Sequence, residues 1–209
     1  MAEIKIAADS GGGSVSLKGP ATTTGNAALT YTLPDATTGG VLRTTTTPGG
    51  LLQVLSSTKT DTFLYNGTQS IDDITGTDQA GSGSVWCVKI TPSSSSNKIL
   101  VLGSISVGSL YYTTVVLYRD STALNIGDAA SSRTRGTFGV GYLQTGDIPT
   151  YNIPYLDSPS STSELTYKFK IGAPYHATYL SYVNRDYTDG DGSWTTRAAS
   201  VITVMEVAG

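Results

Sequence analysis

The sequence contains one cysteine, Cys87, among 209 residues. A single cysteine excludes an intramolecular disulfide, so packing within the chain or assembly with other chains must stabilise the fold. Cys87 lies in a stretch rich in apolar and β-branched residues, where a cysteine usually acts as a small hydrophobic residue. We therefore predict that Cys87 is buried in the core and is not a reactive thiol.

Charged residues are also scarce, at 14% of the chain, and the net charge is -3. Nucleic-acid binding rests on clustered Lys and Arg, and the chain has no basic run. No apolar segment approaches the length of a membrane span. The N-terminus lacks the basic and apolar regions of a signal peptide. We expect synthesis in a cytoplasm, with no nucleic-acid partner and no membrane partner.

No segment has the apolar spacing and end caps of an amphipathic helix. The densest apolar stretch, residues 84–120, is rich in Val, Ile and Tyr, which favour strands. Residues 165–171 alternate apolar and polar side chains, which is typical of a strand with one buried face. Strands are expected at residues 51–56, 60–65, 71–75, 85–91, 98–107, 112–119, 122–126, 137–143, 151–156, 165–171, 178–184 and 200–207, with a glycine- and serine-rich loop at 77–84.

Short strands that recur with turns between them predict an all-β fold, an antiparallel β-sandwich of jelly-roll-like architecture. The first fifty residues differ, because their only aromatic residue is Tyr31 and glycine and threonine clusters interrupt them. So little apolar mass can hardly offset the entropy of ordering the segment. We therefore predict two parts. Residues 1–50 form an extended β-arm for attachment or trimerisation, and residues 51–209 form the β-sandwich head domain.

Two sets of residues resemble known phage proteins. The segment LKGPATTTGNAALTYTLPDATTGGVLRT is similar to the N-terminal part of many tailed-phage appendage proteins. The ordered series SSTKTDTF, ITPSSSSNKILVLGSISVG, IGDAASSRTRGTF, YLDSPSSTSELTYKFKI, YVNRD and AASVITVMEV is more extensive. It resembles a β-sandwich module of structural proteins from marine phages, especially those that infect cyanobacteria. The resemblance covers nearly all of the chain.

This resemblance implies a virion protein without enzymatic activity or cofactor, made in the host cytoplasm and carried in the virion. The expected role is a capsid appendage, such as a head fibre, knob or decoration protein. It implies a homotrimer whose residues 1–50 bind the major capsid protein or another virion protein. The alternative is a tail-fibre adhesin that binds a host surface glycan. A hydrolase that shortens host polysaccharide ranks last.

Candidate catalytic residues are few. His176 is the only histidine, and no GxSxG motif supplies a nucleophile for it. Two carboxylates about 5–10 Å apart would suffice for a glycosidase, but phage depolymerases of that kind usually have long repeat-built β-helices, and no repeat occurs here. We predict no catalytic residue. The acidic candidates weighed for that role were Asp157, Glu164, Asp186, Asp189 and Asp191.

The segment from Asp186 through Asp189 to Asp191 contains hard oxygen ligands, but its spacing misses that of an EF-hand loop. Asp-Gly pairs are common in turns. We therefore predict a turn and assign no metal ligand here, although the spacing alone leaves open whether this loop binds a metal.

Aromatic residues are the strongest indication of binding. The chain has 13 tyrosines and 2 tryptophans against 3 phenylalanines. Tyr and Trp combine an apolar ring with a polar atom, which suits both subunit interfaces and sugar stacking. We favour the interface, because strand propensity explains much of the excess. The candidate glycan or interface contacts are Tyr151, Tyr155, Tyr175, Tyr187 and Trp194. Arg133 and Arg135 are candidate interface arginines.

Overall fold

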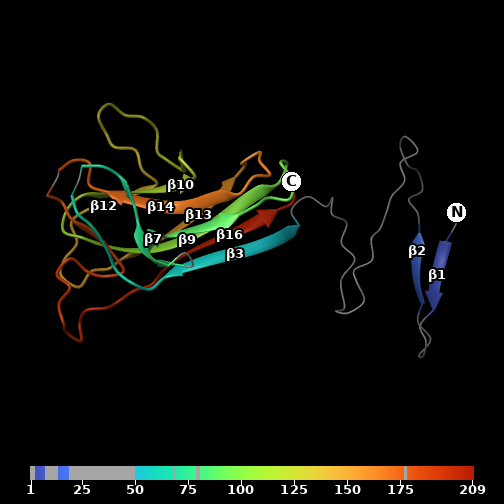
Figure 1. Ribbon diagram of the computed structural model, residues 1–209, viewed down its shortest axis with the longest axis horizontal. Helices are drawn as coiled ribbons and strands as arrows, with labels where there is room; N and C mark the ends of the chain where they lie inside the picture. The colour runs from blue at the N-terminus through green and yellow to red at the C-terminus, as the bar shows by residue number, and fades with distance from the viewer. Residues whose placement is uncertain (1–2, 8–13, 19–49, 68, 79–80, 177) are drawn as a thin grey trace. The chain divides into compact units, whose positions relative to one another are not determined.

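The computed structural model describes residues 3–7, 14–18, 50–67, 69–78, 81–176 and 178–209 (Figure 1). The chain divides into two compact units, Met1–Thr44 and Thr45–Gly209. In the first, β1 (Glu3–Ala7) and β2 (Ser14–Lys18) form an antiparallel hairpin with Glu3 opposite Lys18. Most of the predicted arm lies outside the described residues. Within the described ranges no helix is long and apolar enough to cross a membrane.

The second unit contains two facing antiparallel sheets. The first, called sheet I, has the lateral order β13–β9–β16–β3, and two short strands, β15 and β4, continue the rows of β16 and β3. Figure 1 shows β3, β16 and β9 running alongside one another. The bounds in sheet I are β3 Leu51–Lys59, β4 Phe63–Tyr65, β9 Lys98–Ser109, β13 Thr150–Asp157, β15 Ser181–Val183 and β16 Ser200–Val207.

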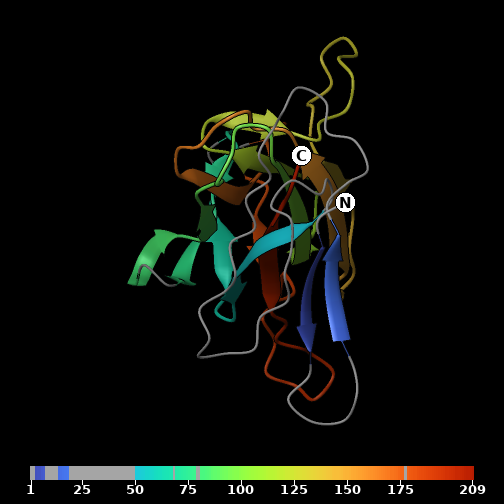
Figure 2. The same cartoon turned by 90° about the vertical axis from the view of Figure 1, so that its right-hand side faces the viewer.

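The other sheet, called sheet II, is centred on β10 and β14. Strands β11 and β12 pair with the free side of β10, while β8 and β5 pair with the free side of β14. The bounds in sheet II are β5 Asp72–Asp73, β8 Cys87–Ile90, β10 Thr113–Arg119, β11 Thr122–Leu124, β12 Phe138–Val140 and β14 Leu165–Gly172. A separate hairpin of β6 (Thr75–Asp78) and β7 (Gly81–Val85) projects beside the sandwich in Figure 2.

The order of the strands identifies the topology. The chain passes from β3 and β4 in sheet I to β5 and β8 in sheet II, and then to β9 in sheet I and β10 in sheet II. It continues through β11 and β12 in sheet II, β13 in sheet I and β14 in sheet II, and it ends with β15 and β16 in sheet I. This alternation between two four-row sheets is the jelly-roll connection. The predicted antiparallel β-sandwich of jelly-roll-like architecture is confirmed.

The core lies between the inner faces of the two sheets. Along β14, Tyr167, Phe169 and Ile171 are fully buried while Lys168 and Lys170 point outward, which confirms the predicted alternation. Gly103 of β9 lies opposite Phe169, because a methyl group added there would stand 2.3 Å from the ring. The ring therefore fills the space that a glycine leaves on the facing sheet. The other buried side chains of this core include Trp86, Ile99, Val101, Ile105, Val115, Leu117, Ile202 and Val204.

Two predicted features near the start of sheet II are wrong. The expected loop at residues 77–84 forms most of the β6–β7 hairpin, and the expected strand at 85–91 is interrupted at Trp86. Trp86 turns its ring into the core at 0% exposure, which separates β7 from β8. Cys87 follows on the outward side of β8 and is half-buried, so it is not the core residue that was expected.

Candidate binding surface at one end of the sandwich

Three loops bring tyrosine rings together at one end of the sandwich. Tyr111 lies in the β9–β10 turn, Tyr142 follows β12, and Tyr179 precedes β15. The rings of Tyr111 and Tyr179 stack with centroids 4.2 Å apart, and Tyr142 meets Tyr111 edge-on at 6.0 Å. Tyr112 contacts Tyr142 at 5.1 Å and Tyr175 lies 6.0 Å from Tyr179. These five residues are called the tyrosine cluster.

Much of the tyrosine cluster faces solvent. The exposed fractions are 72% for Tyr175, 63% for Tyr142 and 53% for Tyr112. The Tyr112 hydroxyl group next to Tyr142 raises the pKa of the Tyr142 phenol. Below the rings, buried hydroxyl groups bond to one another between the strands, from Ser109 to Thr113 and from Thr113 to Ser181. The cluster is therefore an exposed aromatic surface on a hydrogen-bonded base.

The second part of this end is the loop between β15 and β16, called the Asp186–Arg197 loop. Asp186 is buried, and its carboxylate accepts hydrogen bonds from the Thr188 hydroxyl at 2.6 Å, the Asp189 amide at 2.9 Å and the Gly146 amide at 3.1 Å. Burial alone would raise the pKa of Asp186, but these hydrogen bonds outweigh it and lower the pKa. Asp186 therefore holds the loop as an ionised acceptor.

Asp189 holds the same loop from its other side. One carboxylate oxygen contacts Arg197 at 2.5 Å and the other contacts Arg185 at 3.1 Å. All four carboxylate oxygens of Asp186 and Asp189 thus already have a donor from the chain. No group of three or more His, Cys, Asp or Glu side chains suited to a metal ion occurs in the described ranges. The geometry favours the predicted turn, because the Asp186 and Asp189 carboxylates bind groups of the loop itself and of its neighbours.

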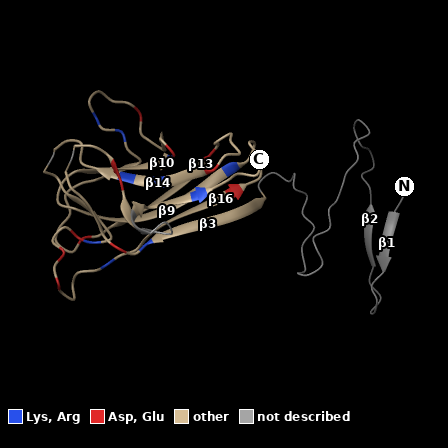
Figure 3. Cartoon of the chain, in the orientation of Figure 1, with Lys and Arg blue, Asp and Glu red and all other residues tan. Residues whose placement is uncertain are grey.

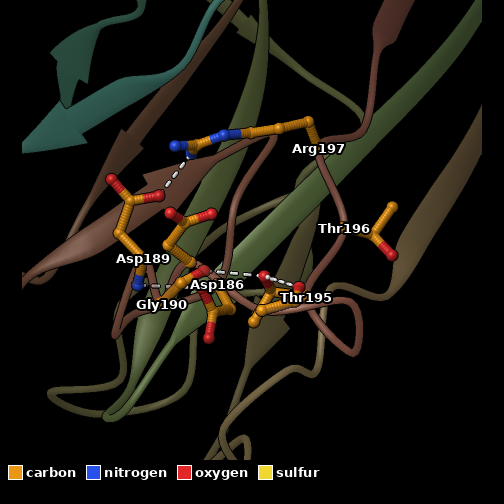
Figure 4. A pocket seen from close by; sticks show the side chains of 8 residues that line it. Asp186, Asp189, Gly190, Thr195, Thr196 and Arg197 are labelled. Atoms are coloured by element: carbon orange, nitrogen blue, oxygen red, sulfur yellow. Dashed lines mark hydrogen bonds and ion pairs between the residues drawn. The ribbon is translucent and has the colours of Figure 1, made fainter.

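A pocket of about 290 Å³ opens within this loop. Figure 4 shows Arg197 and Asp189 joined across it, with Thr195 on another side. The six-membered part of the Trp194 indole lies over Gly192 in the pocket wall, where an added methyl group would stand 2.5–2.7 Å from the ring. Trp194 is nevertheless 74% exposed. One face of the indole is therefore supported and the rest is open to solvent.

Residues 142–147 connect the tyrosine cluster with the Asp186–Arg197 loop. Tyr142 belongs to the cluster, the Thr145 hydroxyl bonds to the Tyr187 hydroxyl at 2.9 Å, and the Gly146 amide bonds to Asp186. The two aromatic regions therefore form one continuous loop-end surface.

The predicted aromatic contacts fall into two groups. Tyr175 and Trp194 are exposed on the loop-end surface, and Tyr187 is half-buried there. Tyr151 and Tyr155 lie on the inward side of β13 and pack against the core, with Tyr151 stacked on Phe138 at 4.4 Å. Both rings are partly buried against the core, and their role as glycan or interface contacts stays a prediction. The sequence analysis did not single out the adjacent tyrosines of this cluster, because it placed Tyr112 at the start of an expected strand and gave Tyr111 no role.

The two candidate interface arginines lie on the exposed loop between β11 and β12, which extends from the sandwich (Figure 3). The Arg135 Nε donates to the Gly127 carbonyl at 2.7 Å, so this side chain helps to shape its own loop. The Arg133 amide donates to the Ala130 carbonyl at 3.1 Å. Pairing of Arg133 and Arg135 with a sister chain stays a prediction.

The remaining candidates for chemistry have structural partners. Asp157 is buried and accepts hydrogen bonds from Arg119 at 2.6 Å and from the Tyr167 hydroxyl at 2.7 Å, which ties β13 to sheet II. Burial and the hydrogen bond to Asp157 raise the pKa of Tyr167. Glu164 pairs with Lys89 at 3.0 Å. The His176 Nδ1 lies 2.9 Å from the Thr178 hydroxyl, and its ring stacks on Tyr179.

A different surface covers the outside of sheet I and is called the neutral face. Its most exposed apolar residues are Leu156 at 50%, Val54 at 48% and Leu102 at 39%. A shallow, mainly apolar depression lies between β13, β9 and β16 on this side. Lys98 lies at the border of this face and carries its only charge among the described residues. The other outward-facing residues of the four strands are uncharged: Val54, Ser56, Thr58, Leu100, Leu102, Ser104, Ser106, Thr150, Asn152, Pro154, Leu156, Val201, Thr203, Met205 and Val207.

The outside of sheet II is different. It carries Lys89, Lys168 and Lys170, and the last two pair with Asp73 at 2.9 and 3.5 Å. One side of the sandwich therefore carries paired charges, and the other carries apolar and uncharged polar side chains.

No family model matches the chain, and no curated protein matches it.

Proposed function

We propose that this protein is a non-enzymatic structural component of a tailed-phage virion, a capsid appendage such as a head fibre, knob or decoration protein. It works as a homo-oligomer, a trimer by the resemblance of its sequence. The single observation that carries this proposal is the neutral face of sheet I, because an assembling protein needs a large surface that is free of unpaired charge.

The occupant that fits the neutral face is a second copy of the same chain. A face without charge matches another neutral surface and gives a charged partner nothing to pair with. Four strands about 4.8 Å apart and about seven residues long make a flat area on the order of 440 Å². Eight of the fifteen residues named for the neutral face are apolar, so this area is a mixed apolar and uncharged polar surface.

The topology and the chain entry point support the same proposal. Jelly rolls are frequent in viral capsid and lectin domains, although a fold alone does not fix a function. The Ala208 amide donates to the Gly50 carbonyl at 2.8 Å, so the chain enters the head domain at β3, the edge strand next to the neutral face. We infer that residues 1–50 bind the capsid protein or another virion protein.

The test is to label intact virions with an antibody against residues 51–209 and to view them by electron microscopy. We expect label on the capsid. A parallel phage whose gene lacks the codons for residues 1–44 should give unlabelled particles although the shortened protein is still made. Unlabelled wild-type particles would contradict the virion role, and labelled particles from the shortened gene would contradict the attachment role of the N-terminal segment.

A second candidate function is adhesion to a host surface glycan. The observation that favours it is the loop-end surface, where Trp194, Tyr175 and Tyr142 are each more than half exposed. Exposed aromatic rings next to polar groups suit the stacking of sugar rings. If this is the function, antibody label appears at the tail and the purified protein binds intact host cells. Capsid label together with no binding to host cells would exclude it.

A further inference from the structure

We propose that the pocket of the Asp186–Arg197 loop binds a neutral pyranose sugar, with Trp194 as the stacking platform. This inference rests on the second candidate function and gives it a site and a ligand class. It separates this pocket from the tyrosine cluster, to which we assign no ligand.

The first step is the position of Trp194. A single exposed apolar residue is ordinary on a protein surface, but this indole packs one side of its six-membered ring against Gly192. Gly192 lines the polar pocket and the indole packs against Gly192, so the ring lies beside the pocket. An open aromatic face beside a polar pocket is what a sugar ring needs for stacking through its C–H groups.

The second step is the set of polar groups that remain free. Among the described residues, the Asp191 carboxylate and the Thr196 hydroxyl have no hydrogen-bond or ion-pair partner, and both line the pocket. Asp191 can accept hydrogen bonds from two neighbouring hydroxyl groups, and Thr196 can donate or accept one. A pyranose ring offers adjacent hydroxyl groups on its edge and an apolar face, which matches both features of the site.

The third step is that the pocket is already shaped. The Thr195 hydroxyl donates to the carbonyls of Gly190 and Gly192 at 2.7 and 2.8 Å, and the Thr195 amide donates to Gly192 at 3.0 Å. Together with the hydrogen bonds to Asp186 and the two arginine contacts of Asp189, these bonds fix both ends of the loop. A preformed site avoids the entropy loss of ordering a loop upon binding.

The charges of the loop select the ligand class. Asp186, Asp189 and Asp191 give three negative charges, while Arg185 and Arg197 give two positive charges that are both paired with Asp189. An acidic sugar would face a surplus carboxylate and no free arginine, so a neutral sugar is favoured. Because every carboxylate oxygen of Asp186 and Asp189 already has a donor, binding does not require a calcium ion.

The test uses the full chain and its own fluorescence. Trp86 is fully buried, so quenching of tryptophan fluorescence by iodide reports the exposed Trp194. The probes are maltoheptaose, mannotetraose and chitotetraose as neutral saccharides, and tetragalacturonate as the acidic one. We expect at least one neutral saccharide to shield Trp194 from iodide, with the same affinity in EDTA, and tetragalacturonate to have no effect.

Four variants locate the site by isothermal titration calorimetry with the saccharide that binds. Trp194→Ala should weaken binding about tenfold or more, as loss of an aromatic anchor does. Gly192→Ala should also weaken it while Trp194 is kept, because the new methyl group displaces the indole. The matched control Gly127→Ala, in the loop between β11 and β12 and not among the pocket residues, should bind as the wild type does, since no atom lies within 4 Å of the added methyl group. Tyr175→Ala, in the tyrosine cluster, should leave the affinity unchanged.

Three results would overturn the inference. They are no protection of Trp194 by any neutral saccharide at about 10 mM, tighter binding of tetragalacturonate, and loss of binding in Tyr175→Ala but not in Trp194→Ala. Adhesion is tested separately with intact host cells. A protein that binds the saccharide through Trp194 but does not bind host cells contradicts the adhesin function and leaves the sugar pocket supported.

Discussion

Gly103 shows how one residue sets the distance between the two sheets. It lies in β9 with the Phe169 ring directly opposite, so a side chain at this position has no space. In the sequence, Gly103 is only a glycine in an apolar run. Nothing there indicates that a ring from the facing sheet fills the space beside its Cα atom. Both partners are recognisable in the sequence, but their pairing is a property of the folded sandwich.

Gly103→Ala should lower the free energy of unfolding by about 1–3 kcal/mol, because Phe169 must move out of a well-packed core. Urea unfolding followed by fluorescence measures this difference. The matched control is Gly141→Ala, which adds a methyl group where no atom lies within 4 Å and should change stability little. Equal stability of Gly103→Ala and the wild type would contradict the packing described here.

Glu206 is a buried acid near the C-terminus that stabilises the opposite end of the sandwich. Its carboxylate accepts hydrogen bonds from Asn97 Nδ2, Gln53 Nε2 and both the amide and hydroxyl of Ser93, at 2.6–2.8 Å. Burial by itself would raise the pKa of Glu206, but these hydrogen bonds outweigh it and lower the pKa below its ordinary value of 4.5. A lowered pKa stabilises the fold above pH 4.5, and this contribution is lost as the pH falls through the lowered value.

Glu206→Gln should therefore be less stable than the wild type at pH 7, by about 1–3 kcal/mol, because an amide replaces an acceptor of charged hydrogen bonds. The difference should shrink as the pH falls below 4.5 and the wild-type carboxylate becomes protonated. Thermal unfolding between about pH 3 and pH 7 gives the comparison. Glu164→Gln, at an exposed ion pair, is the control and should change little at any pH. A difference that grows towards acid pH would be inconsistent with this role of Glu206.

At the scale of elements, the strands with strong alternation were predictable and the interrupted ones were not. β14 could be predicted because one apolar face meets the core along its whole length. β9 continues two residues beyond its expected end, because Gly108 and Ser109 pair with β15, a long-range contact that overrides the local turn signal. The hairpin of β6 and β7 contains mostly glycine, serine and threonine, so composition predicted a loop.

The candidate site was predictable only in part for the same reason. Tyr175 and Trp194 lie in turn-rich segments, and turns place side chains on the surface. Tyr151 and Tyr155 follow a weak strand pattern in the sequence, which did not reveal that β13 turns both rings toward the core. The convergence of residues 142–147 with the Asp186–Arg197 loop depends on jelly-roll connections that no local pattern contains.

At the scale of the whole molecule, the two outer faces of the sandwich differ in charge. Sheet II presents paired lysines to solvent, while sheet I presents the neutral face. Alternating apolar and polar residues predict a sandwich, but the outer side of β16 carries Val201, Met205 and Val207, and that of β9 carries Leu100 and Leu102. Strands that are apolar on both sides in a sheet with only one buried face are the basis of our proposal that a second copy of the chain covers the other face.

The measurement that tests this claim most directly is the mass of the full chain in solution, by size-exclusion chromatography with multi-angle light scattering. We expect a multiple of the 21.7 kDa chain mass, a trimer by resemblance, and a single-chain mass for the Leu102→Lys, Leu156→Lys double variant. The control adds the same charge elsewhere, as Thr122→Lys with Thr162→Lys on exposed positions away from the neutral face, and should keep the wild-type mass. A wild-type mass of 21.7 kDa, or an oligomer that both lysines leave intact, would contradict assembly through the neutral face.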